Sequence, residues 1–197
     1  MTGTVDNLAR ARRLASSMNA STSAVDLALP AARALLEATG EPYRIVGGVA
    51  VVHHGYVRTT VDIDFLVTPK ALVLLSGLAP SHHFAVEGRT RLRHEPSGVR
   101  VDLLVAGDTM PRGGHVYPSP DSLEASASDT SVVGLSSLLD LKLCAHRHQD
   151  VADVVALLKL VSDPAYLEVE SRVPAARRAE LANLRRDALE ELTFERE

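Results

Sequence analysis

The order of apolar patterns along the 197-residue chain predicts an α+β (α/β) protein, with a small mixed β-sheet flanked by helices and a C-terminal helical region. Segments rich in β-branched residues gather between residues 43 and 106, and helical periodicity fills both flanks. We expect N-terminal helices over 1–40, a sheet-containing core over 41–130 and a helical region over 131–197, packed as one compact unit.

The N-terminal region predicts two helices, over 5–18 and about 23–39. Pro30 is expected to interrupt or restart the second helix, and Gly40 to end it. The stretch "VDNLARARRLASSMNAS" also slightly resembles an organellar transit peptide, although an amphipathic first helix accounts for the same spacing.

The central region alternates strand and turn signals. Ser97-Gly98 predicts a hairpin turn, and Thr68 followed by Pro69 predicts the N-terminus of a helix over 69–78. A short helix is expected to end at Gly55, and an edge strand is expected over 122–128. The remaining strands are expected over 43–46, 61–67, 84–88, 90–95 and 99–106.

The pattern after Gly134 is helical. Residues 135–149 and 150–161 predict either a helical hairpin or one long helix with a break, and residues 174–192 predict a final charged helix. Cys144 is the only cysteine, so an internal disulfide is excluded and a reducing cytoplasm fits. Its apolar surroundings indicate a small core residue.

Composition narrows the class of protein. The formal net charge of −4 argues against a surface coated in positive charge for nucleic acid, but it leaves room for a local cluster such as Arg89, Arg91 and Arg93. No apolar run approaches the ~18 residues of a membrane-spanning helix.

Two aspartates on one predicted strand are candidate ligands of a metal ion. Side chains alternate along a strand, so Asp62 and Asp64 should share one face about 7 Å apart, while Ile63 points into the core. Asp102 lies on a later strand with the same alternation. If the strands are neighbours, three carboxylates converge, and such a set of oxygen ligands suits Mg²⁺. A lone D-x-D also occurs where aspartates simply cap or solvate a strand end.

Gly47 and Gly48 follow the first strand and open a helix. Glycines at such a turn let the backbone approach a phosphate closely. A glycine pair alone is a weak signal, but one followed by D-x-D after a short helix and a loop is more specific.

Taken together, "VGG", "DIDF" and the later "VDLL" resemble the signature of the DNA polymerase β-like nucleotidyltransferase superfamily. The stretch "GGVAVVHHGYVRTTVDIDFLV" is most similar to the branch with the abortive-infection AbiEii toxins of type IV toxin–antitoxin systems. The helical stretch "LLDLKLCAHRHQDVADVVALL" is similar to a motif that those proteins carry after the catalytic sheet. Gln149 stands where the family usually has Arg or Lys. The resemblance covers about residues 43–160.

The resemblance implies a nucleotidyltransferase core and a role for each matching residue. Asp62, Asp64 and Asp102 would bind Mg²⁺, or Mn²⁺ in its place, and Asp102 could act as general base. Gly47 and Gly48 would hold the triphosphate. The remaining implied contacts involve Lys142 with phosphate, Asp150 with Lys142 or the nucleotide, and Arg58 with phosphate or an aspartate. Asp153 is expected at a helix surface or in a structural role.

Three functions follow from this interpretation. The first is Mg²⁺-dependent transfer of NMP from an NTP such as ATP to an acceptor hydroxyl with release of pyrophosphate, by a toxin-like enzyme that acts on tRNA or another RNA and has a cognate antitoxin. The second is nucleotidylation of a small molecule of the aminoglycoside or lincosamide type. The third is a catalytically silent fold used for binding.

Overall fold

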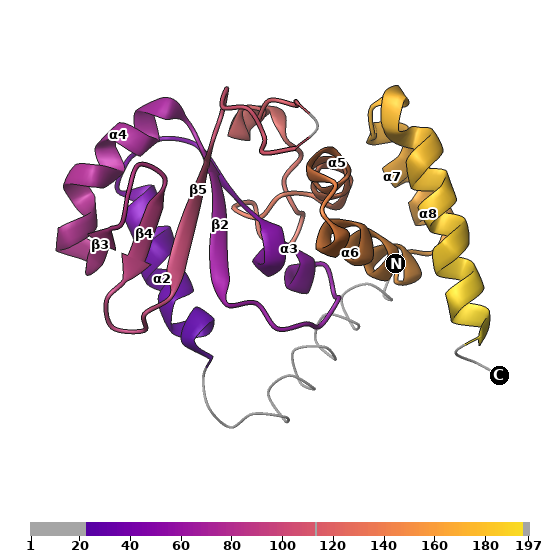
Figure 1. Ribbon diagram of the computed structural model, residues 1–197, viewed down its shortest axis with the longest axis horizontal. Helices are drawn as coiled ribbons and strands as arrows, with labels where there is room; N and C mark the ends of the chain where they lie inside the picture. The colour runs from indigo at the N-terminus through magenta and orange to yellow at the C-terminus, as the bar shows by residue number, and fades with distance from the viewer. Residues whose placement is uncertain (1–22, 113, 195–197) are drawn as a thin grey trace.

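The computed structural model describes residues 23–112 and 114–194, and its centre is a five-stranded mixed sheet (Figure 1). The strand order is β1-β2-β5-β4-β3. β2 and β5 run parallel, and the other neighbouring pairs run antiparallel. The strands are β1 (Tyr43–Val46), β2 (Asp62–Val67), β3 (Phe84–Val86), β4 (Arg91–His94) and β5 (Arg100–Val105). The predicted fold class is therefore confirmed.

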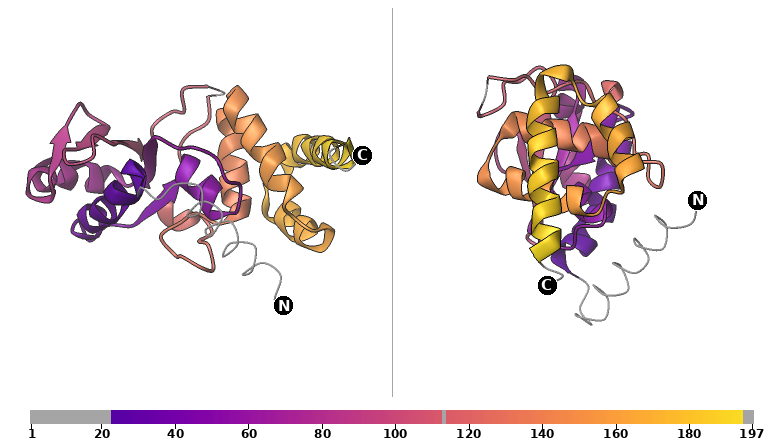
Figure 2. Two further views of the ribbon diagram at one scale, coloured as in Figure 1. Left: turned by 90° about the horizontal axis from the view of Figure 1, so that it is seen from below. Right: turned by 90° about the vertical axis from the view of Figure 1, so that its right-hand side faces the viewer.

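Helices flank the sheet and extend from one end of it (Figure 2). They are α2 (Ala24–Glu37), α3 (Gly47–His53), α4 (Pro69–Leu78), α5 (Leu135–Ala145), α6 (His148–Lys159), α7 (Asp163–Arg172) and α8 (Ala175–Phe194), with two 3₁₀ turns, η1 (Ala79–His82) and η2 (Pro120–Ser122). α2 and α4 lie against the sheet, while α7 and α8 lie farthest from it, beyond α5 and α6 (Figures 1 and 2). No helix within the described ranges is both long and apolar enough to cross a membrane.

The alternation of side chains gives the sheet two different faces. Ile63 and Phe65 of β2 and Val101 of β5 are fully buried, on the face that α2 and α4 cover. The residues between them point to the opposite face, which we call the open face. The core is mainly aliphatic, so its stability comes from burial of branched side chains rather than from aromatic stacking.

Two predictions about the chain's local structure are wrong. Pro30 does not interrupt α2, which continues through it. Proline removes one backbone donor from a helix, and here the disrupted turn lies on the exposed side, where water can satisfy the freed carbonyl. Residues 122–128 form no regular strand: Ala125 makes an isolated bridge with Val133, and residues 131–133 in turn pair with the outer edge of β1.

The C-terminal region contains one more helix than predicted. His146 adopts a left-handed conformation with φ of 48°, which separates α5 from α6 and favours the hairpin over one long helix. α7 was not predicted, because Val169 is its only buried residue and it lacks a clear apolar stripe. The predicted final helix is confirmed as α8, and the predicted helix over 5–18 lies outside the described residues.

Candidate functional site

Three carboxylates lie together on the open face, supplied by two adjacent parallel strands. Asp62 and Asp64 flank the buried Ile63 on β2, and Asp102 occupies the same face of β5. The register places Asp64 directly beside Asp102, and Asp62 beside Arg100. Like charges directly opposite each other in a sheet repel, so this arrangement needs cations nearby.

Arginines on β4 and β5 supply part of that positive charge. Arg100 donates from Nε to Oδ2 of Asp102 and from Nη2 to Oδ2 of Asp62, each over 3.0 Å. Arg91 lies opposite Asp102 on β4 and donates to its Oδ1 over 3.0 Å. Both oxygens of Asp102 therefore accept a hydrogen bond from a guanidinium group.

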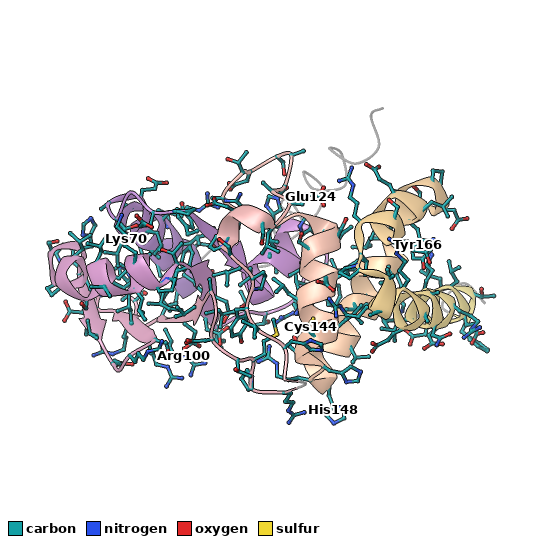
Figure 3. All side chains as sticks on the ribbon, turned by 90° about the horizontal axis from the view of Figure 1, so that it is seen from above. Lys70, Arg100, Glu124, Cys144, His148 and Tyr166 are labelled. Carbon is teal, nitrogen blue, oxygen red and sulfur yellow. The ribbon has the colours of Figure 1, made fainter. Side chains whose placement is uncertain are left out.

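Two further arginines, each also paired with a carboxylate, extend this set of guanidinium groups. Arg93 pairs with Glu87, and Arg89 pairs with Asp108 over 2.7 Å. Figure 3 shows Arg100 on the sheet side of the molecule, away from the C-terminal helices that carry Tyr166. We call this exposed set the arginine edge; it comprises Arg89, Arg91, Arg93 and Arg100, whose side chains are 64%, 50%, 43% and 46% exposed.

Asp64 has an unusual protonation equilibrium. Burial raises the pKa of Asp64 to about 6, and the charges of Asp62 and Asp102 act in the same direction, against the opposing charges of Arg147 and Lys142. A carboxyl group with a pKa near neutrality, surrounded by other ionisable groups, is typical of functional sites.

The glycine turn packs directly against these residues. Gly47 has a φ of +60°, and a Cβ there would lie 1.9 Å from Oδ2 of Asp64. A Cβ on Gly48 would lie 2.4 Å from Oγ1 of Thr60. The two glycines therefore allow α3 to approach β2 closely, which the spacing alone did not reveal. Their contact with a triphosphate stays a prediction.

An ion network joins α5 and α6 to the segment before β2; Lys142, Asp150 and Asp153 are buried at its centre, and the Arg147 side chain at its rim is 66% exposed. Nζ of Lys142 lies 3.2 Å from Oδ1 of Asp150 and 2.7 Å from Oδ2 of Asp153. Arg58 donates to Asp153 over 3.0 Å, and Arg147 donates to Asp150 over 2.7 Å. Three cations and two carboxylates leave one excess positive charge, close enough to Asp64 to affect its pKa.

The network decides between several interpretations of the sequence. Lys142 is 5% exposed, so it is not a surface lysine, and its Nζ donates to Oδ1 of Asp150. Asp153 is fully buried, so it does not lie at the helix surface, and Arg58 pairs with it. Gln149 donates to Asp153 over 3.0 Å. The phosphate contact of Lys142 and the nucleotide contacts of Arg58 and Asp150 stay predictions.

Tyr117 is a residue of this region that the sequence did not indicate. It lies on the loop between β5 and α5, anchored by backbone hydrogen bonds with Gly107 and Asp108. Burial raises the pKa of the Tyr117 phenol; the charge of Arg147 opposes this shift, and that of Asp64 adds to it. The pattern of residues 107–121 predicts only a loop, and no local signal places Tyr117 near the carboxylates.

The two histidines at the end of α3 contact the segment that follows η2. Nε2 of His53 lies 2.9 Å from Oγ of Ser126, and Nε2 of His54 lies 2.8 Å from the carbonyl oxygen of Val133. Burial lowers the pKa of His54. These contacts attach the loop to α3.

The oxygen atoms of the three carboxylates are suitable ligands for a divalent metal, but the side chains are not arranged around a metal position in this structure. They offer hard oxygen ligands with uncompensated repulsion at Asp64, as Mg²⁺ sites do. Yet among residues 23–112 and 114–194, no group of three or more His, Cys, Asp or Glu side chains is arranged to hold a metal ion. The guanidinium of Arg100 bridges Asp62 and Asp102 instead.

Comparison with known proteins leaves the family open. No family model and no curated protein matches the chain. Among solved structures, the chain is similar to ANT(2″)-Ia in complex with adenylyl-2″-tobramycin, with 13% identity and a TM-score of 0.46. The match covers 76% of this chain and 92% of that chain. A likeness this distant transfers no residue roles.

Proposed function

We propose that this protein is a metal-dependent nucleotidyltransferase that moves NMP from an NTP to an acceptor hydroxyl and releases pyrophosphate. The observation that carries the proposal is the convergence of Asp62, Asp64 and Asp102 from adjacent parallel strands beside the Gly47–Gly48 turn. Asp62, Asp64 and Asp102 would hold Mg²⁺ or Mn²⁺, which would neutralise charge at the phosphorus centre. The resemblance of "VGG", "DIDF" and "VDLL" to the DNA polymerase β-like signature supports the same class.

The residues on the helix side of Asp64 favour an anionic nucleotide. The ion network carries one excess positive charge, and Lys142 and Arg147 are the cations that act on Asp64. Because Lys142 is fixed between two buried carboxylates, it acts as a positioned charge rather than a mobile hydrogen-bond donor. This positive field would attract the triphosphate to the site.

In the reaction that we propose, the chain supplies the base. A carboxylate, assigned to Asp102 by the resemblance, takes the proton of the attacking hydroxyl. The hydroxyl oxygen then bonds to the α-phosphorus, the bond from that phosphorus to the α,β-bridging oxygen breaks, and pyrophosphate leaves with the electron pair.

Within this class, we propose RNA as the acceptor, with the 3′ end of tRNA as the first candidate. The arginine edge borders the carboxylates with four exposed guanidinium groups, and phosphate oxygens of a nucleic acid are natural partners for them. A growth-inhibiting toxin with a cognate antitoxin is the biological setting that the resemblance suggests.

The test is transfer of radiolabel from each of the four α-³²P NTPs, in the presence of Mg²⁺, to total tRNA and to a panel of aminoglycosides and lincosamides. Wild type is compared with Asp62→Asn and with Asp187→Asn, which changes an exposed aspartate on α8. We expect one NTP to label tRNA, with a loss of at least about 100-fold in Asp62→Asn, the scale on which loss of one electrostatic group slows catalysis. The Asp187→Asn control should keep wild-type activity.

Other outcomes separate the alternatives. Label in a drug would assign the small-molecule function and overturn the RNA acceptor. Equal labelling by wild type and Asp62→Asn would show a contaminating activity and overturn the assignment of the site. No transfer together with no NTP binding would leave the catalytically silent fold.

A further inference from the structure

We infer that Arg100 competes with the divalent metal for the carboxylates of Asp62 and Asp102, so that metal binding and release of Arg100 are a single exchange. The inference rests on the proposed function, because it concerns the metal ligands of the same site.

The geometry of Arg100 carries the inference. Its Nε and Nη2 each donate over 3.0 Å, one to Oδ2 of Asp102 and the other to Oδ2 of Asp62, so one guanidinium bridges both strands. Arg91 occupies the remaining oxygen of Asp102. A metal that binds these oxygens needs the lone pairs that the arginines now hold, and no described group of acidic side chains is arranged for a metal in this state.

The exposure of the arginines makes the exchange feasible. The Arg100 side chain is 46% exposed and the Arg91 side chain is 50% exposed. Ion pairs of this kind contribute only about 0–1 kcal/mol each, because solvent screens them. The guanidinium groups can therefore rotate outward into the solvent while the carboxylates bind a doubly charged ion. Lys142 differs, because its ammonium is buried between two carboxylates.

The exchange has a consequence for the acceptor surface. While Arg100 pairs with Asp62 and Asp102, its charge is neutralised within the sheet. Once released, it adds a free guanidinium to the arginine edge, beside the site of transfer. The surface that would contact acceptor phosphates becomes more basic only when metal is bound.

The matched control is Arg93. It lies on the open face of β4 directly opposite Arg100, and its side chain has a similar exposure of 43%. It pairs with Glu87 rather than with any of the three aspartates. Arg93→Gln therefore removes the same charge from the same face without freeing a proposed metal ligand.

The experiment is a titration of Mn²⁺ alone into the EDTA-treated full-length protein, followed by the electron paramagnetic resonance signal of free Mn²⁺. We expect Arg100→Gln to lower the Kd for Mn²⁺ by about fivefold or more, which corresponds to one ion pair of about 1 kcal/mol. Arg93→Gln should change the Kd less than twofold. Arg100→Lys keeps the charge but loses the two-pronged contact, so its Kd should fall between those of wild type and Arg100→Gln.

The outcomes separate this inference from the proposed function. If a folded Arg100→Gln protein binds Mn²⁺ no more tightly than wild type, the exchange is overturned while the metal site stays in place. If Arg93→Gln lowers the Kd for Mn²⁺ as much as Arg100→Gln does, the effect is one of general charge and the exchange is likewise overturned. If Arg100→Gln does not fold, Arg100→Lys decides the matter in the same way. Absence of Mn²⁺ binding in every folded variant, wild type included, overturns the metal site and the exchange together.

Discussion

Replacement of Gly47 by alanine tests the central geometric feature of the site, the close approach of α3 to the carboxylate strand. Alanine at this position would adopt the left-handed φ of +60°, and its Cβ would lie 1.9 Å from Oδ2, 2.6 Å from Cγ and 2.9 Å from Cβ of Asp64. Gly40 offers a matched control, because it has a similar φ of +67° with nothing within 4 Å of an added Cβ.

The magnitude follows from the difference between the two positions. Both alanines lose about 1–2 kcal/mol of stability from the left-handed conformation. Gly47→Ala adds the clash with Asp64, which is rooted on a central strand and can move only if β2 or α3 shifts. Such overpacking costs about 1–3 kcal/mol. We therefore expect Gly47→Ala to be about 1–3 kcal/mol less stable than Gly40→Ala.

Urea unfolding at equilibrium measures this difference. With an m value of about 2 kcal/mol per molar, the midpoint of Gly47→Ala should lie about 0.5–1.5 M below that of Gly40→Ala. The penalty should shrink in an Asp64→Ala background, which removes the two closest atoms. Equal midpoints for the two glycine variants would refute the reasoning, because the contact between the glycine turn and Asp64 would then not exist.

Three further predictions concern Asp64, the ion network and α4. The pKa of Asp64 is raised from its ordinary 3.8 to about 6, so the folded protein binds the proton of the Asp64 carboxyl group more tightly than the unfolded chain does. The protonated carboxyl group therefore contributes stability at low pH, and this contribution is lost as the pH rises through about 6. In EDTA, Asp64→Asn should therefore gain unfolding free energy relative to wild type between pH 4 and 7, and a pH-independent difference would contradict this. Lys142→Met leaves two buried carboxylates short of a partner and should cost about 3–5 kcal/mol in urea unfolding. The control is Lys70→Met, which removes a lysine that is 74% exposed and should cost under about 1 kcal/mol. Similar losses of stability in Lys142→Met and Lys70→Met would argue against the network. Thr68→Ala removes the side-chain acceptor for the Ala71 N–H at the start of α4 and should cost about 1 kcal/mol by thermal or urea unfolding. Thr68→Ser keeps the hydroxyl group and should have the stability of wild type. Wild-type stability in Thr68→Ala would exclude the cap.

Local periodicity was enough to predict the parts of the site that lie on one strand. Alternation along β2 predicted that Asp62 and Asp64 share a face while Ile63 is buried, because side chains of a strand point to opposite sides whatever the surroundings. The turn residues likewise predicted the helix that begins at Pro69 and the hairpin at Ser97-Gly98, since both depend on backbone preferences of a few residues.

The sequence alone determined which residues carry the charges and which face of each strand they occupy. Only the tertiary structure decided which charges meet: Arg100 bridges Asp62 and Asp102, and Lys142 is buried between Asp150 and Asp153. It also placed Tyr117 near Asp64 and kept α2 continuous through Pro30. The physical reason is that local patterns fix the direction of a side chain, whereas ion pairing and burial depend on strand register and helix packing between segments far apart in the chain.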